Sequence, residues 1–304
     1  DGEFSVNARY VEGDVVVEDY MEVSYLPVQI NYYVDADSGS NENDGLTEEN
    51  AFASIQFAID TAEDGDSVLI LPGSYFENIV FGGKAVAVKG FGGVPVIDGD
   101  GYWAVSFFDG EGHDSVLKNV ILTNSYMGVF ISNSSPTIQN VNIIGNIFGI
   151  EAYSGSEPDV VNCILWNNSD GDVFGFQPRY SCIERETEST GVGNIITPPM
   201  FADAGASDFR LQSEFGRYAP ILGFWVIDEV TSPCINTGDP AIKPAEETMP
   251  NGGRINMGAY GGTNQASRGQ WVLKGDINRD GFVNLADFAI IAESWLVGLE
   301  WLEG

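Results

Sequence analysis

The stretches YMGVFISNSSPTIQNVNIIGN (126–146) and IFGIEAYSGSEPDVVNCILWNN (147–168) repeat one another. Pro136 matches Pro158 and Asn140 matches Asn162, each pair 22 positions apart. Short β-branched runs broken by Asn, Gly, Ser and Pro fill the repeat, and it contains no apolar period of helical length. A repeat of this length is typical of a solenoid, in which each coil buries its apolar side only against its neighbours. The sequence therefore predicts an all-β solenoid of parallel strands.

The repeat also predicts which side chains face the core and which form the turns. We expect a core that contains Val116, Val129, Ile138, Ile143, Ile150, Val160 and Leu165. Asparagines recur at the same interval, and we expect Asn124, Asn146 and Asn168 to stack at one turn and to hydrogen-bond along the axis. Six coils between about residues 67 and 200, at a strand separation of about 4.8 Å, would form a rod about 30 Å long.

Two further stretches carry a family resemblance. Residues 32–92 open with YYVDADSGSNENDG, and Ile55, Ala58 and Ile59 after Ser54 have the spacing of a short amphipathic helix. Residues 200–267 contain SPCI (232–235) and GGRINMGAYGG (252–262). Over residues 32–267 the chain resembles the secreted bacterial right-handed parallel β-helix proteins of the pectate-lyase-like class. The resemblance implies an N-terminal capping helix on the first coil and a closing segment after the last coil.

Residues 276–287, DINRDGFVNLAD, have the spacing of an EF-hand-like calcium loop followed by a helix. Oxygen donors occupy loop positions 1, 3, 5, 9 and 12, a glycine occupies position 6, and a carbonyl serves at position 7. The expected Ca²⁺ ligands are Asp276, Asn278, Asp280, the carbonyl of Phe282, Asn284 and Asp287. The loop is similar to one dockerin repeat. Dockerins that bind cohesins carry two repeats, and Leu285-Ala286 replaces their hydroxyl pair, so the resemblance does not imply cohesin binding.

These observations divide the chain into three predicted parts. A strand-rich N-terminal segment covers residues 1–31, the parallel β-helix with its caps covers 32–267, and the dockerin-like half-repeat covers 268–304.

The composition limits the classes of partner. The chain has 45 acidic and 13 basic residues and a net charge of −32, which repels nucleic acid and anionic membrane surfaces. No apolar run is long enough to span a membrane. The first residue, Asp1, follows neither an initiator Met nor a signal peptide, as expected of a processed secreted protein. Cys163 and Cys182 lie about one coil apart, so they form either a bridge between coils or, together with Cys234, buried thiols.

The search for catalytic residues leaves several alternatives open. A polysaccharide lyase needs a base and cations that neutralise the substrate carboxylate, and the middle and late coils offer only three basic residues, which share no register: Lys118, Arg179 and Arg185. A hydrolase needs paired carboxylates, and the acidic candidates are Asp98, Asp100, Asp109 and Asp114. The single histidine, His113, is expected in a turn, and Arg254 is expected to bind carbonyls in the closing segment. Trp103, Phe130 and Trp225 either pack in the protein or stack on sugars.

The sequence favours a secreted calcium-binding β-helix with an extracellular structural or adhesive role. Self-association through the termini would build a filament or surface layer. The alternatives are a polysaccharide lyase or another enzyme that acts on extracellular polysaccharide, and a carbohydrate-binding module without catalysis.

Overall fold

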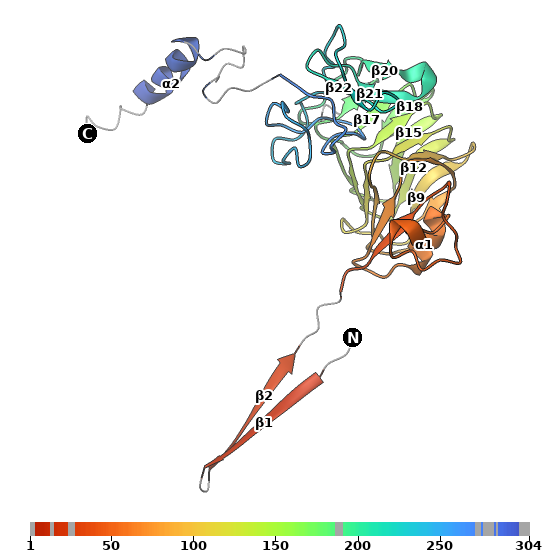
Figure 1. Ribbon diagram of the computed structural model, residues 1–304, viewed down its shortest axis with the longest axis vertical. Helices are drawn as coiled ribbons and strands as arrows, with labels where there is room; N and C mark the ends of the chain where they lie inside the picture. The colour runs from red at the N-terminus through yellow and green to blue at the C-terminus, as the bar shows by residue number, and fades with distance from the viewer. Residues whose placement is uncertain are drawn as a thin grey trace.

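The computed structural model describes residues 4–12, 15–23, 28–185, 191–270, 275, 283 and 285–297. The main body is an all-β parallel solenoid of about five turns, as the repeat predicts. The coils are thus slightly fewer than the six expected. In Figure 1, β9, β12, β15 and β18 follow one another along the solenoid.

Each full coil contributes one strand to each of three parallel sheets. Sheet 1 contains, in spatial order, β16 (Asp159–Val161), β13 (Thr137–Gln139), β10 (Val116–Lys118), β7 (Ala87–Gly90), β4 (Ser67–Ile70) and β3 (Asn31–Val34). Sheet 2 contains β19 (Cys182–Ile183), β17 (Ile164–Trp166), β14 (Asn142–Ile144), β11 (Ile121–Thr123), β8 (Val96–Asp98) and β5 (Ser74–Phe76). Sheet 3 contains β18 (Gly171–Phe174), β15 (Phe148–Tyr153), β12 (Met127–Ser132), β9 (Trp103–Phe107) and β6 (Ile79–Val80).

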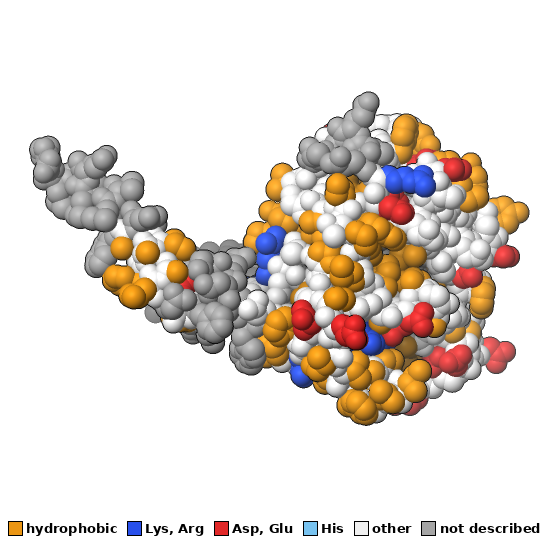
Figure 2. All heavy atoms as spheres, turned by 90° about the horizontal axis from the view of Figure 1, so that it is seen from above, with side chains coloured by type: hydrophobic (Ala, Val, Ile, Leu, Met, Phe, Trp, Pro, Cys, Tyr) orange, Lys and Arg blue, Asp and Glu red, His pale blue; other side chains and the backbone are white. Residues whose placement is uncertain are grey.

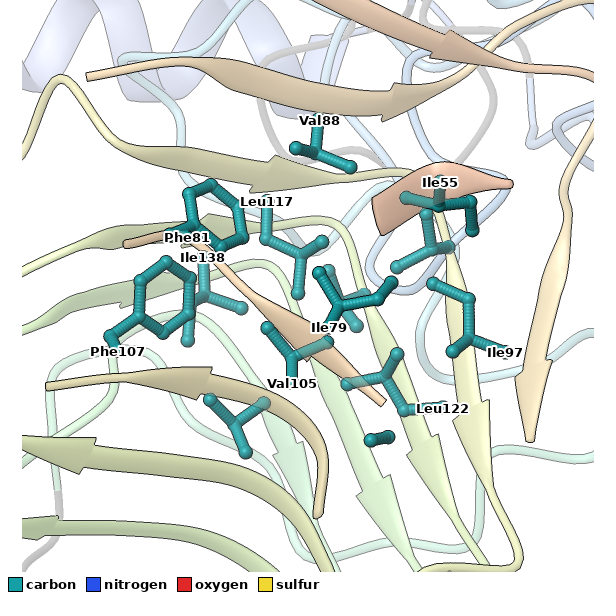
Figure 3. Close-up of a cluster of buried hydrophobic side chains, with 14 of the residues drawn as sticks. Ile55, Ile79, Phe81, Val88, Ile97, Val105, Phe107, Leu117, Leu122 and Ile138 are labelled. Atoms are coloured by element: carbon teal, nitrogen blue, oxygen red, sulfur yellow. The ribbon is translucent and has the colours of Figure 1, made fainter. Parts of the chain in front are cut away.

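The three sheets enclose one apolar core that runs through the solenoid (Figure 3). Phe81 and Phe107 are fully buried and their ring centroids lie 4.3 Å apart. Val129 pairs with Ile150 and both are buried, while Phe130 and Glu151 pair on the outer side of the same strands. This alternation follows from the two-residue period of a strand, which sends successive side chains to opposite faces.

The strand register corrects part of the predicted core. Ile138 pairs with Val160, and Ile143 pairs with Leu165, at the expected interval. One coil earlier, however, the residue opposite Ile138 is Leu117, and Val116 lies opposite Thr137 and is only half-buried. That coil is one residue shorter, and a shift of one residue moves a side chain to the other face of a strand. The prediction that Val116 lies in the core is therefore wrong.

A short helix, α1 (Ile55–Thr61), packs beside the first coil. Its side chains Ile55, Ala58 and Ile59 are buried in the solenoid core. Glu77 accepts hydrogen bonds from the first two backbone N–H groups of α1, and the Lys84 Nζ donates to three carbonyls at its end at 2.8 Å each. A carboxylate at the N-terminus and an ammonium group at the C-terminus of a helix satisfy free backbone groups and match its dipole.

Residues 200–267, which we call the closing segment, pack against the outer face of sheet 2. Ile164 and Cys182 pack with Met257, and Ile121 and Ile144 pack with Tyr260. The segment contains two small antiparallel pairs, β20 (Phe201–Asp203) with β21 (Asp208–Leu211), and β22 (Arg217–Ala219) with β23 (Phe224–Val226). Short 3-10 turns occur at η1 (Glu48–Asn50) and η2 (Ala204–Ala206).

The remaining elements lie towards the two termini. β1 (Phe4–Glu12) and β2 (Val15–Val23) form an antiparallel hairpin. α2 (Leu285–Val297) is a helix in the region where the sequence predicts one at the end of the expected calcium loop. No helix in the described part of the chain has the length and apolar character needed to cross a membrane. On the surface seen in Figure 2, hydrophobic side chains gather in several patches between scattered acidic and basic ones.

Candidate functional site

Three asparagines join the solenoid to the closing segment at the turn between sheets 1 and 2. Asn119, Asn140 and Asn162 follow successive strands of sheet 1, and each has a left-handed backbone with φ of 54°, 53° and 56°. Asparagine tolerates this conformation better than most residues. Asn119 Nδ2 donates to the carbonyls of Ala259 and Gly261 at 2.8 and 2.9 Å.

The other two asparagines continue the same pattern. Asn140 Nδ2 donates to the carbonyls of Asn256 and Gly258 at 2.9 and 3.0 Å, and Asn162 Oδ1 accepts from the N–H of Asp239 at 2.7 Å. The closing segment therefore follows the solenoid axis past three coils. Among these residues, the 22-residue repeat matches only Asn140 with Asn162, because Asn119 precedes Asn140 by 21 positions.

Glycines in the GGRINMGAYGG stretch allow this close contact. Gly258 has a φ of 85°, and an added Cβ would lie 2.6 Å from Asn142 Oδ1 and from Ile164 Cδ1. An added Cβ at Gly261 would lie 2.3 Å from the Asn140 Nδ2. Real Cβ atoms do not approach their neighbours so closely, so both positions require glycine.

The closing segment and the solenoid together form a hollow of about 470 Å³, which we call the lysine hollow. Its solenoid wall contains Lys89 on β7 and Lys118 on β10, and its other wall contains Glu246, Thr263 and Asn264. Asn119 lines the hollow as well as holding the closing segment in place. The two lysines are direct partners in the register of sheet 1, where neighbouring strands lie about 4.8 Å apart.

The charges in the lysine hollow are unusual for this chain. Neither lysine amino group has a hydrogen-bond or ion-pair partner among the described residues. Burial lowers the pKa of Lys118, and the like charge of Lys89 lowers it further. Two cations side by side, without a counter-charge, favour the binding of an anion.

The other basic residues that the sequence analysis considered have structural partners. Arg179 binds the carboxylates of Asp159, at 3.0 Å, and Asp239. Arg185 donates to the carbonyl of Ser169 at 2.7 Å. Arg254 donates to the carbonyls of Gly238 and Thr237, which is the role expected for it.

The expectation that the basic residues share no register overlooked Lys89. It precedes Lys118 by 29 positions, outside the 22-residue repeat, because the intervening coil is longer. The pairing is visible only when the strands are aligned. The signal in the sequence is that each of two short apolar runs has a lysine directly after Val88 or Leu117.

The predicted asparagine ladder is formed by two of its three residues. Asn146 and Asn168 are buried, and the Asn146 Nδ2 donates to Asn168 Oδ1 at 3.1 Å. The position that precedes Asn146 in the stack is Ser125, whose N–H donates to Asn146 Oδ1 at 3.0 Å. Asn124 is exposed and donates to Asp98 at 2.8 Å, so it lies outside the ladder. The short coil that displaces Val116 also displaces Asn124.

The acidic candidates do not form a catalytic pair. The carboxylate of Asp98 accepts hydrogen bonds within a turn, from the Asn124 side chain and from the N–H of Asp100. Asp100, Asp109 and Asp114 are exposed, as is His113. A buried carboxyl group that was not expected from the sequence lies in the closing segment: Glu247 is 6% exposed. Burial raises the pKa of Glu247 to about 7, and its Oε1 accepts from the N–H groups of Asn256 and Gly262 at 2.8 Å each.

Aromatic and thiol groups also have defined positions. Trp103 and Phe130 stack on each other on the outer side of sheet 3, whereas Trp225 lies under the guanidinium of Arg268 at 4.0 Å. Cys163, Cys182 and Cys234 are free and buried, so the alternative of a bridge between Cys163 and Cys182 is not formed. Burial raises the pKa of Cys163 to about 12.

The expected calcium loop lies mostly outside the described residues. Asp276, Asn278, Asp280, Phe282 and Asn284 belong to the part that is not described. Asp287, on α2, is described and is 2% exposed. Elsewhere in the described chain, no group of three or more His, Cys, Asp or Glu side chains is arranged to hold a metal ion.

Solved structures that match this chain include a pectate lyase and a lacto-N-biosidase. Pectate lyase Pel9A is 18% identical, with a TM-score of 0.36, and the match covers 56% of this chain and 58% of that chain. The GH136 lacto-N-biosidase from Eubacterium ramulus is 17% identical, with a TM-score of 0.33, and the match covers 59% of this chain and 39% of that chain. The matches therefore span less than two thirds of either protein. No family model and no curated protein matches the chain. The parallel solenoid is established by the strand pairing of this chain itself.

Proposed function

We propose that the protein binds an acidic polysaccharide at the lysine hollow and cleaves it by β-elimination. The observation that carries this proposal is a pair of lysines, Lys89 and Lys118, that have no charged partner among the described residues and lie in a hollow of a chain with a net charge of −32. Nearly all the other described cations are held by carboxylates, carbonyls or an aromatic ring. A uronate carboxylate would supply the missing counter-charge.

The two lysines suit different parts of the reaction. The lowered pKa of Lys118 increases the fraction of neutral amine, which can accept the proton from the carbon next to the uronate carboxylate. The ammonium group of Lys89 would stabilise the negative charge that develops on that carboxylate. The electron pair of the broken C–H bond forms a double bond, the glycosidic C–O bond breaks, and the leaving oxygen takes a proton from water.

The overall negative charge does not prevent this binding. At physiological ionic strength the Debye length is about 8 Å, so distant carboxylates are largely screened from a ligand in the hollow. Glu246 is the acidic residue that lines the hollow, and it has no ion pair with either lysine among the described residues. Local charge in the hollow is therefore positive.

The first prediction tests both lysines against a matched control. Lys118→Gln should abolish the formation of unsaturated, ultraviolet-absorbing ends on pectate or alginate, and should weaken binding less than it slows cleavage. Lys89→Gln should weaken binding about tenfold or more, because it removes the cation that pairs with the carboxylate. Lys243→Gln removes an exposed lysine of the closing segment and should change neither.

Binding is measured by affinity electrophoresis in gels that contain the polysaccharide, and cleavage by absorbance. Retention of full binding and cleavage by the double variant, Lys89→Gln with Lys118→Gln, would refute the proposal. Binding without cleavage by the wild-type protein would reduce it to a carbohydrate-binding role.

The calcium loop, the extracellular location and the self-association remain proposals beside this one. The six positions of the loop, from Asp276 to Asp287, support Ca²⁺ binding through their spacing alone. Leu285 and Phe288 on α2 are 84% and 60% exposed, which supports a contact between this helix and another molecule of the chain. Such contacts suit a secreted surface protein that forms a filament or surface layer.

A further inference from the structure

The outer face of sheet 3 carries a continuous row of aromatic rings. The aromatic row consists of Trp103, Phe130, Tyr153 and Phe174, one from each of the neighbouring strands β9, β12, β15 and β18. The centroid distances along the row are 4.3, 5.9 and 5.3 Å. Four strands at a separation of about 4.8 Å make the row about 14 Å long.

Three of the four rings of the aromatic row are exposed to solvent although they contact one another, and Phe130 is half-buried. Trp103, Tyr153 and Phe174 are 40%, 39% and 54% exposed. In sheet 2, the outer side chains of Ile121, Ile144 and Ile164 are buried against the closing segment, whereas most of the row is exposed in the described structure. A contiguous exposed patch of large apolar side chains marks an interaction site more often than scattered ones do.

The orientation of the rings changes along the row. Trp103 and Phe130 are nearly parallel, at 13°, so each covers one face of the other. The angle then opens to 39° between Phe130 and Tyr153 and to 45° between Tyr153 and Phe174. Tyr153 and Phe174 therefore leave part of their ring faces open, and Phe174 at the end is the most exposed.

The polar groups beside the row indicate the kind of ligand. Glu151 lies in register between Phe130 and Phe174, and its carboxylate accepts the hydroxyl of Tyr153 at 2.5 Å. The hydroxyls of Ser132 and Ser154 lie nearby, 3.4 Å from each other. The four strands WAVSF, MGVFIS, FGIEAY and GDVF contain no Lys or Arg.

This combination excludes an anionic partner and favours a neutral one with many hydroxyl groups. A carboxylate on strands that carry no Lys or Arg repels nucleic acid, anionic lipid and acidic polysaccharide. It accepts hydrogen bonds from sugar hydroxyls, while the apolar C–H face of a pyranose packs on an open aromatic ring. A second copy of the chain would bring another Glu151 and a net charge of −32 to the same face.

We infer that the aromatic row is a binding surface for a neutral polysaccharide, separate from the lysine hollow. The ligand class is an uncharged pyranose chain that lies along the solenoid axis, with its sugar faces on Tyr153 and Phe174 and its hydroxyls towards Glu151. The inference rests on sheet 3 alone and does not depend on the proposed cleavage reaction.

The test uses the full chain and three neutral polymers, xyloglucan, galactomannan and mixed-linkage β-glucan. The wild-type protein should be retarded in a gel that contains at least one of them, and Phe174→Ala and Tyr153→Ala should each weaken that binding about tenfold. Phe76→Ala is the matched control, because Phe76 is 74% exposed on β5 of sheet 2 and should be neutral. Tyr153→Phe keeps the ring and should retain most of the affinity, whereas Glu151→Gln should reduce it.

Unchanged thermal unfolding of each variant shows that the fold is intact. An absence of binding to all three polymers overturns the inference. It is also overturned if Phe174→Ala binds as the wild type does, or if light scattering shows a dimer that this variant abolishes, because the row would then be a contact between copies of the chain. Loss of uronate binding in the lysine variants leaves this inference unaffected.

Discussion

Glu247 shows how a single buried carboxyl group links the closing segment to pH. Its Oε1 holds the N–H groups of Asn256 and Gly262, while its Oε2 is buried without a partner in the described structure. Gly262 and the neighbouring Glu246 line the lysine hollow, so this carboxyl group supports one wall of the proposed site. Burial is the main cause of its raised pKa, and the two N–H groups partly oppose that effect.

The second prediction concerns the pH dependence of stability. Because the folded pKa of Glu247 is raised to about 7 from 4.5, the protonated form is favoured on folding. The contribution of Glu247 to the free energy of unfolding is fully present below pH 4.5. It is lost as the pH rises through 7, which lowers that free energy by an amount on the order of 3 kcal/mol. Glu247→Gln keeps the acceptor oxygen and cannot ionise. Urea unfolding at pH 5 and pH 9 should therefore show a smaller loss of stability for the variant than for the wild type.

A matched control is Glu157→Gln, which changes an exposed carboxylate of the solenoid. Its difference in stability between pH 5 and pH 9 should equal that of the wild type. If Glu247→Gln shows as large a difference in stability between pH 5 and pH 9 as the wild type, the pH dependence does not come from Glu247.

At the scale of elements, two turns with buried amides fix the register of the coils. The third prediction is that Asn146→Ala lowers the free energy of unfolding by about 1–3 kcal/mol, because the bonds to Asn168, Ser125 and the carbonyl of Leu122 are lost. Asn124→Gly is the control, since it keeps the left-handed turn and removes one exposed side chain. Chemical denaturation measures both. Equal losses would show that the buried ladder contributes nothing beyond a surface amide.

The fourth prediction tests the close approach of the closing segment. Gly258→Ala places a methyl group 2.6 Å from Asn142 and Ile164 and should displace the segment, which would make it more sensitive to limited proteolysis. Gly253→Ala has a similar positive φ of 69° but an open neighbourhood, so it carries the backbone strain without the clash. A Gly258 variant no more sensitive than the Gly253 variant would argue against the packing described here.

At the scale of the whole molecule, the predicted calcium loop at residues 276–287 gives the fifth prediction. Calorimetry should detect one Ca²⁺ ion per chain, and Asp276→Asn combined with Asp280→Asn should abolish the heat of binding. Asp109→Asn combined with Asp114→Asn makes the same change of charge at exposed turns and should bind normally. Binding that survives the loop changes would place the ion elsewhere. The absence of any binding by the wild type would remove calcium from the proposal.

The sequence predicted the parallel coils because short apolar strands recur at a nearly constant interval. It misplaced Val116 and Asn124 because one coil is a residue shorter, which no local pattern reveals. It missed the pairing of Lys89 with Lys118 because a different coil, the one between these two lysines, is longer than the repeat. The contact of Asn119 with Ala259 joins residues 140 positions apart, and only the folded chain brings them together.

The path of the closing segment has a mechanical consequence. A plain stack of coils can peel from one end, coil by coil, because each coil bonds only to its neighbours. Here a single stretch of backbone runs lengthwise and is tied to Asn119, Asn140 and Asn162 in turn. A pulling force along the solenoid axis therefore acts on these hydrogen bonds at the same time rather than on one coil after another. This stretch of backbone holds the three coils together, so that they separate as one cooperative unit.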